Sequence, residues 1–312
     1  MAKIVTLTAN PALDIAMHVE QLVPSHKMRC SAVRRDPGGG GINVARVVHR
    51  LGGKALAVYA AGGSAGDQIA NLLDGEGLQH RPVRVKGQTR ESFNVTDDKT
   101  GEQYRFILAG DALDQGEWNA CVSASLTAVA PGDYFVCSGS LPPGVPTDFY
   151  AGAISSAKAK GARTVVDSQG ESLRAVLESG VDVVKASARE LGAYLGRTLS
   201  DAQSWRDAMR AILQSGKAEM IAVTLGERGA LLVTPSDAWQ VTVPQVPAST
   251  TVGAGDSFLG GMLVKLIAGC PGDVALRYAA AAGTAALLTS GTGLCNPADV
   301  ERLNAEVVVA KL

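Results

Sequence analysis

Thr251-Val252-Gly253-Ala254-Gly255-Asp256-Ser257 joins a glycine turn, the start of a helix and a carboxylate at one point of this 312-residue chain. A strand-like segment at 239–243 precedes it, and an apolar helical pattern rich in glycine and alanine runs on to about residue 268. Glycine turns without a Cβ clash, and the first N–H groups of a helix carry the positive end of its dipole. The stretch therefore predicts a site for an anion, above all a phosphate, with the Asp256 carboxylate beside it as a base. In the alternative interpretation, the glycines serve close helix packing and Asp256 is a charge at the helix start.

A second glycine run, Gly38-Gly39-Gly40-Gly41, lies between a strand-like segment and a helical pattern at 42–51. Such a run leaves the backbone open to close approach by a ligand, although a lone run is also typical of a flexible loop. Asn43, in the first turn of the predicted helix, offers an amide suited to a sugar hydroxyl. Upstream, Asp14 follows the buried-strand pattern at 4–7, where open α/β sheets bind ligands. Asp14 could instead be a turn residue after Pro11.

The pattern of strands and helices along the chain predicts an α/β fold. Buried-strand patterns lie at 4–7, 55–60, 134–137, 163–166, 181–184 and 220–224, and helical patterns lie at 42–51, 66–73, 117–128, 148–160, 187–195, 205–213, 254–267 and 274–288. This alternation is typical of a parallel sheet covered by helices on both faces. Two segments interrupt it: 15–23 with 28–35, and 89–96 with 103–108, read as β-hairpins that should form a small separate sheet.

The composition is that of a compact enzyme with no affinity for nucleic acid. The hydrophobic fraction is 46%, and the net charge of −1 gives no electrostatic footprint for nucleic acid. Five cysteines are scattered without a C-x-x-C pair, which predicts buried free thiols in a reducing cytosol. Four histidines without ligand spacing argue against zinc. Neither a signal peptide nor an apolar run of roughly 18 residues is present, so we expect a cytoplasmic protein that does not enter the membrane.

Several of these segments, taken together and in order, resemble the motifs of the PfkB (ribokinase-like) carbohydrate kinases. They are 10–14, 38–43, 138–144, 166–168, 224–230 and 253–256, and they span nearly the whole chain. The resemblance implies one ribokinase-like kinase domain over residues 1–312, a three-layer αβα unit with a mostly parallel sheet. It also implies a small β-sheet lid over the sugar, formed by about 12–36 and 88–109. Segments 27–30, 38–41 and 101–106 look most like the bacterial 6-phosphofructokinase branch, whose substrate is fructose 6-phosphate. Fructose-1-phosphate kinases and tagatose-6-phosphate kinases are near relatives that stay open.

For the acceptor side, the resemblance makes Asp256 the base that takes the proton of the sugar hydroxyl. Gly253, Ala254 and Gly255 then form the anion hole for the transferring phosphoryl group, because no Walker-type G-x-x-x-x-G-K-[ST] loop occurs. It assigns the sugar to Asp14, Gly39, Gly40, Asn43 and Ser140, and the sugar's phosphate to Lys27 and Arg90 on the lid. An ammonium with a guanidinium is a good phosphate receptor, although either group taken alone is more often a solvated surface charge.

For the donor side, the resemblance implies ATP and Mg²⁺. It assigns the nucleotide to Lys185, Ser187, Thr224, Gly226 and Gly229, and hydrated Mg²⁺ to Glu190. Taken alone, the 224–229 loop would be read as an ordinary β-hairpin. Ser187 stands where the family has asparagine, and a hydroxyl reaches less far towards a metal-bound water than an amide. Thr250 stands where most relatives carry an aspartate beside a monovalent-cation site, which leaves dependence on K⁺ open.

Two other classes of function compete with a sugar-phosphate kinase. A non-catalytic sugar-binding homologue would be expected to lose the base, yet Asp256 and its glycines are present. A nucleotide-dependent oxidoreductase would need a G-x-G-x-x-G after a strand, which is absent. We further expect a homodimer joined through the lid, since a two-hairpin sheet cannot cover both of its faces alone. The apolar lid residues expected to contact the second copy are Ile15, Met17, Val19, Phe93, Val95, Tyr104, Phe106 and Leu108. A monomer whose lid closes on its own domain is the alternative.

Overall fold

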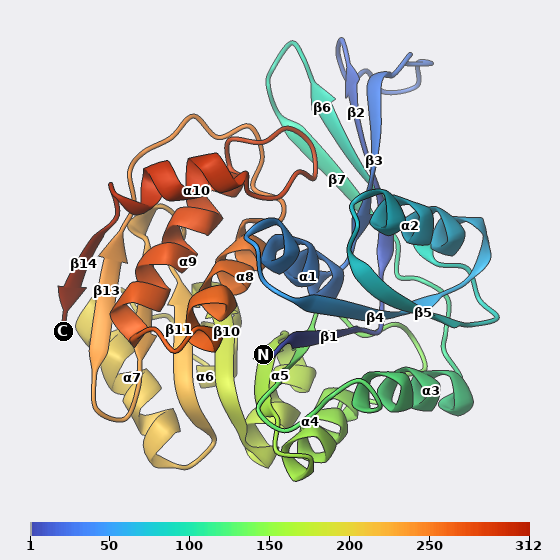
Figure 1. The fold of residues 1–312 in the computed structure, drawn as a ribbon. Helices are drawn as coiled ribbons and strands as arrows, with labels where there is room; N and C mark the ends of the chain where they lie inside the picture. The colour runs from blue at the N-terminus through green and yellow to red at the C-terminus, as the bar shows by residue number, and fades with distance from the viewer. Residues whose placement is uncertain (1) are drawn as a thin grey trace.

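A ten-stranded sheet forms the centre of the protein in the computed structural model, which describes residues 2–312 (Figure 1). Its strand order is β14-β13-β12-β11-β10-β9-β8-β1-β4-β5. The strands are β1 (Ile4–Thr8), β4 (Ala55–Ala61), β5 (Gln79–Arg84), β8 (Tyr134–Ser138), β9 (Arg163–Asp167), β10 (Val181–Ser187), β11 (Ala218–Thr224), β12 (Ala230–Val233), β13 (Ala238–Thr242) and β14 (Val308–Lys311). From β5 to β11 neighbouring strands are parallel, and from β11 to β14 they are antiparallel. The parallel part aligns the carboxyl ends of seven strands along one edge.

Helices cover both faces of this sheet and divide the core in two. One face packs against α1 (Gly40–Arg50), α2 (Gly63–Gly75), α8 (Ala254–Ile267), α9 (Gly272–Ala286) and α10 (Pro297–Asn304). The other packs against α3 (Gln115–Leu126), α4 (Phe149–Ala159), α5 (Gly170–Ser179), α6 (Ala188–Leu195) and α7 (Ala202–Gln214). Successive strand residues point to opposite faces, so Ile4 lies in the first core and Val5 in the second. This three-layer arrangement is the predicted α/β fold.

A four-stranded sheet projects from the main body and is called the lid here (Figure 1). It consists of β2 (Ala12–Val19), β3 (Ser31–Gly38), β6 (Arg90–Asp97) and β7 (Gln103–Ile107), in the order β3-β2-β6-β7. Both predicted hairpins are present. They join into one small sheet, as predicted, but the sequence did not predict how: β2 and β6 are parallel, from Ala12 opposite Arg90 to Val19 opposite Asp97. As a result, Asp36, Asp14 and Ser92 form one row across the lid.

The structure differs from the sequence-based prediction mainly at sheet edges and at the glycine run. β5, β14, α5 and α10 were not predicted; β5, for example, lies at an edge of the large sheet, and its sequence is polar and interrupted by Pro82. Asp14 is the third residue of β2 rather than a turn residue after β1. Helix α1 starts at Gly40, before the predicted residue 42, so it absorbs two of the four glycines.

Two further expectations from composition can be compared with the structure. The cysteines are free, as predicted, but Cys30 is exposed and Cys270 is partly exposed, while Cys121, Cys137 and Cys295 are buried. Cys30 belongs to the connection between β2 and β3, outside the core. No helix within residues 2–312 is both long and apolar enough to cross a lipid bilayer.

Candidate active site

Most of the predicted site residues converge on the carboxyl edge of the parallel strands. Strands β1, β8, β9, β10 and β11 end there at Thr8, Ser138, Asp167, Ser187 and Thr224. The amino ends of α1 and α8 meet at the same edge, and Asn43 Nδ2 donates a hydrogen bond of 2.8 Å to Asp256 Oδ2. Ligands of open α/β sheets bind outside this edge. The two sequence motifs, 213 residues apart, therefore form one site.

The start of α8 has the geometry of an anion hole. Gly253 caps the helix with φ of +76°, a left-handed conformation that favours glycine, and Asp256 is the third helical residue. A Cβ at Gly255 would lie 2.7 Å from Lys185 Nζ, so the lysine ammonium lies directly over the first turn. Unpaired N–H groups, the helix dipole and a nearby ammonium together favour a phosphoryl group.

Lys185 links this helix start to Asp167, which the sequence prediction quoted in a motif without giving it a role. Its Nζ donates to the two carboxylate oxygens of Asp167 at 2.9 and 3.1 Å. Burial alone would lower the pKa of Lys185, but the charges of Asp167 and Asp256 raise it above its usual value, so the ammonium stays charged. The signal for Asp167 was its position directly after the buried strand pattern at 163–166.

The pKa values of the carboxyl groups are shifted upwards at this site. Burial raises the pKa of Asp256, while Lys185 and the hydrogen bond from Asn43 act against that rise. Burial likewise raises the pKa of Asp167 to about 6, with Lys185 lowering it and Asp256 raising it further. A base works best when its pKa lies near the working pH. Asp256 is thus shifted in the direction that makes a carboxylate a better proton acceptor.

The residues predicted to bind the sugar include Asp14, which lies at the root of the lid. A Cβ at Gly38 would collide with the Asp14 carboxylate, so this carboxylate lies directly over the glycine. Burial raises the pKa of Asp14 to about 6, opposed by the charges of Arg90 and Arg105 and supported by those of Asp36 and Asp256. Arg105 also acts on Asp256. Sequence reasoning missed Arg105, whose signal is its position as a cation between Tyr104 and Phe106 in an alternating strand.

The two predicted phosphate-binding cations occupy different places. The Arg90 guanidinium donates to the backbone carbonyls of Asn10, Pro11 and Leu108, close to Asp14. Lys27 is exposed in the connection between β2 and β3, at the end of the lid away from the Asp14–Asp36 pair. The structure therefore brings Arg90, but not Lys27, to the Asp14 end of the lid.

The glycine run packs closely against protein atoms on the side where a Cβ would lie, while Gly39 and Gly40 stay partly exposed. Gly38 faces Asp14, a Cβ at Gly40 would collide with Ser138, and Gly39 caps α1 with φ of +111°. Close packing at the junction of β3 and α1 thus gives a second reason for the glycines, and access of a ligand to the Gly39–Gly40 backbone stays a prediction. Ser140 lies near this loop, where its hydroxyl accepts a hydrogen bond of 3.3 Å from Asn10 Nδ2.

A cavity of about 310 Å³ adjoins the anion hole. Its lining includes three of the predicted nucleotide-binding residues, Thr224, Gly226 and Gly229, and the helix start at Ala254 and Gly255. Apolar side chains, among them Val243, Val246, Phe258 and Leu287, form much of the rest. Its volume and mostly apolar wall suit a flat ring such as a nucleobase.

Ser187 and Glu190, the other predicted donor-side residues, bind each other at the start of α6. The Ser187 N–H donates to Glu190 Oε2 at 2.7 Å, and the Glu190 N–H donates to Ser187 Oγ at 3.3 Å. They form a capping box, in which each side chain binds the other residue's backbone N–H. Within residues 2–312 there is no cluster of three or more histidine, cysteine or acidic side chains arranged to hold a metal ion.

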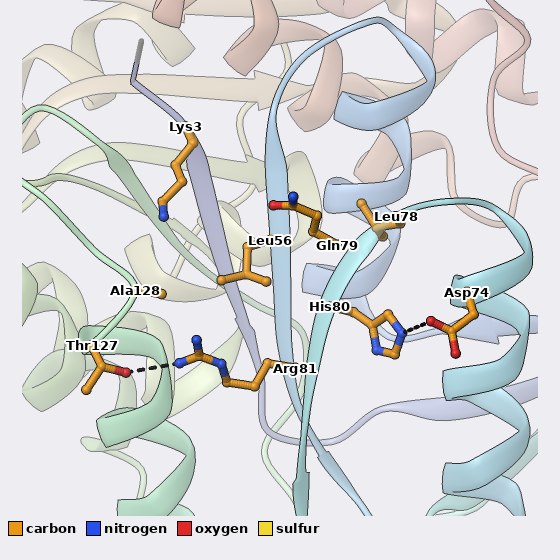
Figure 2. A pocket seen from close by; sticks show the side chains of 9 residues that line it. All are labelled: Lys3, Leu56, Asp74, Leu78, Gln79, His80, Arg81, Thr127 and Ala128. Carbon is orange, nitrogen blue, oxygen red and sulfur yellow. Dashed lines mark hydrogen bonds and ion pairs between the residues drawn. The ribbon is translucent and has the colours of Figure 1, made fainter.

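A larger cavity, of about 640 Å³, lies at the opposite, amino edge of the sheet (Figure 2). Its polar side chains bind one another: His80 Nε2 contacts Asp74 Oδ1 at 3.0 Å, and Arg81 Nη1 donates to Thr127 Oγ1 at 3.0 Å. Lys3, just before β1, also faces it. Asp256 and the anion hole lie at the other end of the strands, so the smaller cavity is the one that belongs to the candidate active site.

The chain is similar to known proteins along almost its whole length. A model of the pfkB family carbohydrate kinases matches residues 7–299. The ATP-dependent 6-phosphofructokinase isozyme 2 of Escherichia coli is 41% identical over 306 residues, covering 98% of this chain and 99% of that protein. A 1-phosphofructokinase of Rhodobacter capsulatus is 30% identical, covering 99% of this chain and 98% of that protein. The crystal structure of phosphofructokinase-2 from Escherichia coli in complex with substrates and products matches with a TM-score of 0.94 at 40% identity, covering 98% and 99% of the two chains. The chain belongs to the pfkB family of carbohydrate kinases.

Proposed function

We propose that this protein is an ATP-dependent 6-phosphofructokinase, which converts fructose 6-phosphate into fructose 1,6-bisphosphate. One observation carries the proposal: the Asp256 carboxylate, bound by Asn43, stands at a helix start that lines a cavity of nucleotide size. Asp14 and two arginines are within electrostatic reach on the other side. The name of the relative at 41% identity supports fructose 6-phosphate, whereas the 1-phosphofructokinase is only 30% identical.

In the mechanism that follows, Asp256 accepts the proton of the acceptor hydroxyl. The freed oxygen forms a bond to the γ-phosphorus of ATP, the bond between that phosphorus and the β–γ bridging oxygen breaks, and ADP leaves. Gly253, Ala254 and Gly255 supply N–H groups to the transferring phosphoryl, and Lys185 adds positive charge beside them. Catalysis of phosphoryl transfer rests mainly on such positioning and charge stabilisation.

We propose Mg²⁺ as the metal that accompanies ATP. Magnesium in such sites keeps several waters and needs only one or two carboxylates besides the phosphates. Glu190 fits this role, because its capping contact uses Oε2 and the side chain stays at the carboxyl edge. The metal would neutralise charge on the phosphates. We also propose that K⁺ activates the enzyme by binding near Thr250. The Thr250 hydroxyl accepts a hydrogen bond of 3.1 Å from the Val252 N–H, so it shapes this turn in place of the aspartate that most relatives carry.

For the phosphate of the sugar, we propose a receptor formed by Arg90 and Arg105. Both guanidinium charges act on Asp14, and Arg90 is held against the lid root by three carbonyls. The family resemblance assigns Lys27 to the same phosphate. We propose it only as a weaker alternative, because it is exposed in a connection at the far end of the lid. Asp14, Asn43 and the Gly39–Gly40 backbone would bind the sugar hydroxyls, with Ser140 nearby.

The test of the proposed function is a comparison of kcat/KM for fructose 6-phosphate, fructose 1-phosphate and tagatose 6-phosphate, measured as ADP formation with ATP and Mg²⁺. We expect the kcat/KM for fructose 6-phosphate to exceed the values for the other two sugar phosphates by at least about tenfold. This corresponds to a difference of about 1.4 kcal/mol in transition-state binding. A higher value for either competitor would reassign the substrate within the family. Absence of ADP with all three would contradict the kinase assignment itself.

We also propose that two copies of the chain associate through their lids. Val33, Tyr104, Phe106 and Leu108 are 48, 40, 52 and 51% exposed, whereas Ile15, Val19 and Val95 are already buried within the chain. The uncovered apolar surface is thus narrower than the sequence suggested and lies on β3, β7 and the residue after β7. A two-fold pair of lids would cover it.

Light scattering at micromolar concentration should give twice the chain mass of 32.1 kDa, and Phe106→Glu should shift the protein to the monomer. Val308→Glu is the matched control, because Val308 is equally apolar and 64% exposed but lies on β14. A monomeric wild type, or a shift caused by Val308→Glu as well, would contradict lid-to-lid association.

A further inference from the structure

Asp36 is a buried carboxylate at the lid root that contacts side chains of β3, of α1 and of the loop after α9. It is 4% exposed and lies near the end of β3. Arg34 donates to its Oδ1 from Nε and Nη2 at 3.1 and 2.8 Å, and Arg46 Nη2 on α1 lies 3.8 Å from the same oxygen. Thr292 Oγ1 donates to Oδ2 at 2.6 Å, from 256 residues further along the chain.

The loop that carries Thr292 lies between the lid and the anion hole. On the lid side, a Cβ at Gly291 would lie 3.0 Å from the Ala16 Cβ on β2. On the other side, a Cβ at Gly253 would lie 2.7 Å from Leu294 Cδ2, and the Cys295 N–H donates to Ser257 Oγ at 3.4 Å. The loop therefore touches both the sugar-binding strand and the cap of the catalytic helix.

Helix α1 completes the connection. Arg46, 1% exposed, donates from Nη1 to the Pro37 carbonyl at 2.8 Å and from Nε to Glu76. Asn43, three residues earlier and so on the same side of the helix, holds Asp256. Asp36 itself pairs directly with Asp14 across β2 and β3. A shift of Asp36 would therefore move Asp14 relative to Asp256.

From this geometry we propose that Asp36 and Thr292 are positioning residues for phosphoryl transfer. Their hydrogen bond holds the lid root, and with it Asp14 and Arg105, at a fixed place against the loop that backs the anion hole. Neither side chain touches the reacting atoms. They act through the alignment of acceptor and phosphoryl, where a displacement of about 1 Å can cost about 10²-fold in rate. This inference rests on the proposed kinase function.

The test is Thr292→Val, which removes the hydroxyl and keeps the shape of the side chain. We expect kcat/KM for fructose 6-phosphate to fall about tenfold. This is less than the loss of roughly 10²-fold that a displacement of about 1 Å can cause, because only one hydrogen bond is removed. The KM for ATP should stay within about twofold, because the cavity at Gly255 is not altered, and Thr292→Ser should restore the wild-type value. Binding of ATP, measured separately by calorimetry, should be unchanged.

Thr289→Val is the matched control. Its hydroxyl belongs to the same loop but donates to the carbonyls of Ala286 and Gly293, within that segment. Thermal unfolding of both valine variants measures the general loss of loop stability. Asp36→Asn and the double variant, Asp36→Asn with Thr292→Val, complete a double-mutant cycle. The kcat/KM of the double variant should fall no further than that of Asp36→Asn alone, because both substitutions break the same hydrogen bond.

Two results would overturn the positioning role: Thr292→Val with wild-type kinetics, or the same kinetic loss in Thr289→Val. Failure of the proposed function is distinguishable, because it would appear in the wild type as the absence of ADP formation from fructose 6-phosphate. If the wild type prefers another ketose phosphate, the same variants are measured with that substrate.

Discussion

Asp256→Asn is expected to lower kcat by about 10²-fold or more, because an amide cannot accept the proton of the acceptor hydroxyl. The KM values should change little, since the substitution keeps the size of the side chain at the start of α8. Steady-state kinetics with ATP and fructose 6-phosphate measure this. The matched control is Asp273→Asn, which alters another first-turn aspartate, on the neighbouring helix α9. Near-wild-type turnover of Asp256→Asn would remove the base assignment.

The same base should govern the acidic limb of the pH profile. Burial raises the pKa of Asp256, so its carboxylate becomes protonated at a higher pH than an ordinary aspartate. Since the base works deprotonated, wild-type kcat/KM should be lost as the pH falls through this raised pKa. The residual activity of Asp256→Asn should lack that limb. An identical limb in the variant would mean that a different group, such as Asp14 or Asp167, limits the reaction in acid.

Arg105→Met is expected to raise the KM for fructose 6-phosphate by about 10–10²-fold, the effect of losing a charge-assisted hydrogen bond of about 1.5–3 kcal/mol. The KM for ATP should not change, because the nucleotide cavity is lined by other residues. Arg105→Lys should retain part of the affinity, as it keeps the charge but loses the planar fork. Initial rates over both substrate concentrations provide the two KM values.

The control for this variant is Lys99→Met, a cation in the turn of the same hairpin whose Nζ donates to Gln21 Oε1. Arg105 also opposes the burial-raised pKa values of Asp14 and Asp256, so its removal should move the acidic limb to higher pH. Equal losses of affinity for ATP and sugar phosphate, or an effect of Lys99→Met, would indicate a disturbed lid instead of a lost phosphate contact.

Local patterns predicted those parts of the fold that depend on local physics. The glycine turn before Asp256, the strand at β1 and the two lid hairpins are encoded within a few residues each, and the structure contains them. The hydrogen bond between Asn43 and Asp256, the parallel pairing of β2 with β6 and the ion pair of Lys185 with Asp167 are contacts between distant segments. Periodicity carries no information on such contacts. Arg105 was missed for this reason, because its charge can be related to Asp14 only after β6 and β7 are placed beside β2 in the lid.

The glycine run shows a second limit. Four glycines in sequence can open a backbone to a ligand or let two backbones approach, and both readings obey the same steric rule. The collision of a Cβ at Gly38 with Asp14, and of one at Gly40 with Ser138, shows that the close approach is present, while Gly39 and Gly40 stay partly exposed. This close approach could not be predicted from the run itself, because the neighbouring atoms come from β2 and β8.

The contact between α1 and α8 at the active site has a consequence for folding during synthesis. Strand β1 lies inside the sheet between β4 and β8, and Asn43 precedes its partner Asp256 by 213 residues. Contacts of such long sequence separation close late and slowly in folding. A nascent chain on the ribosome can therefore assemble much of its sheet while it is still unable to phosphorylate anything.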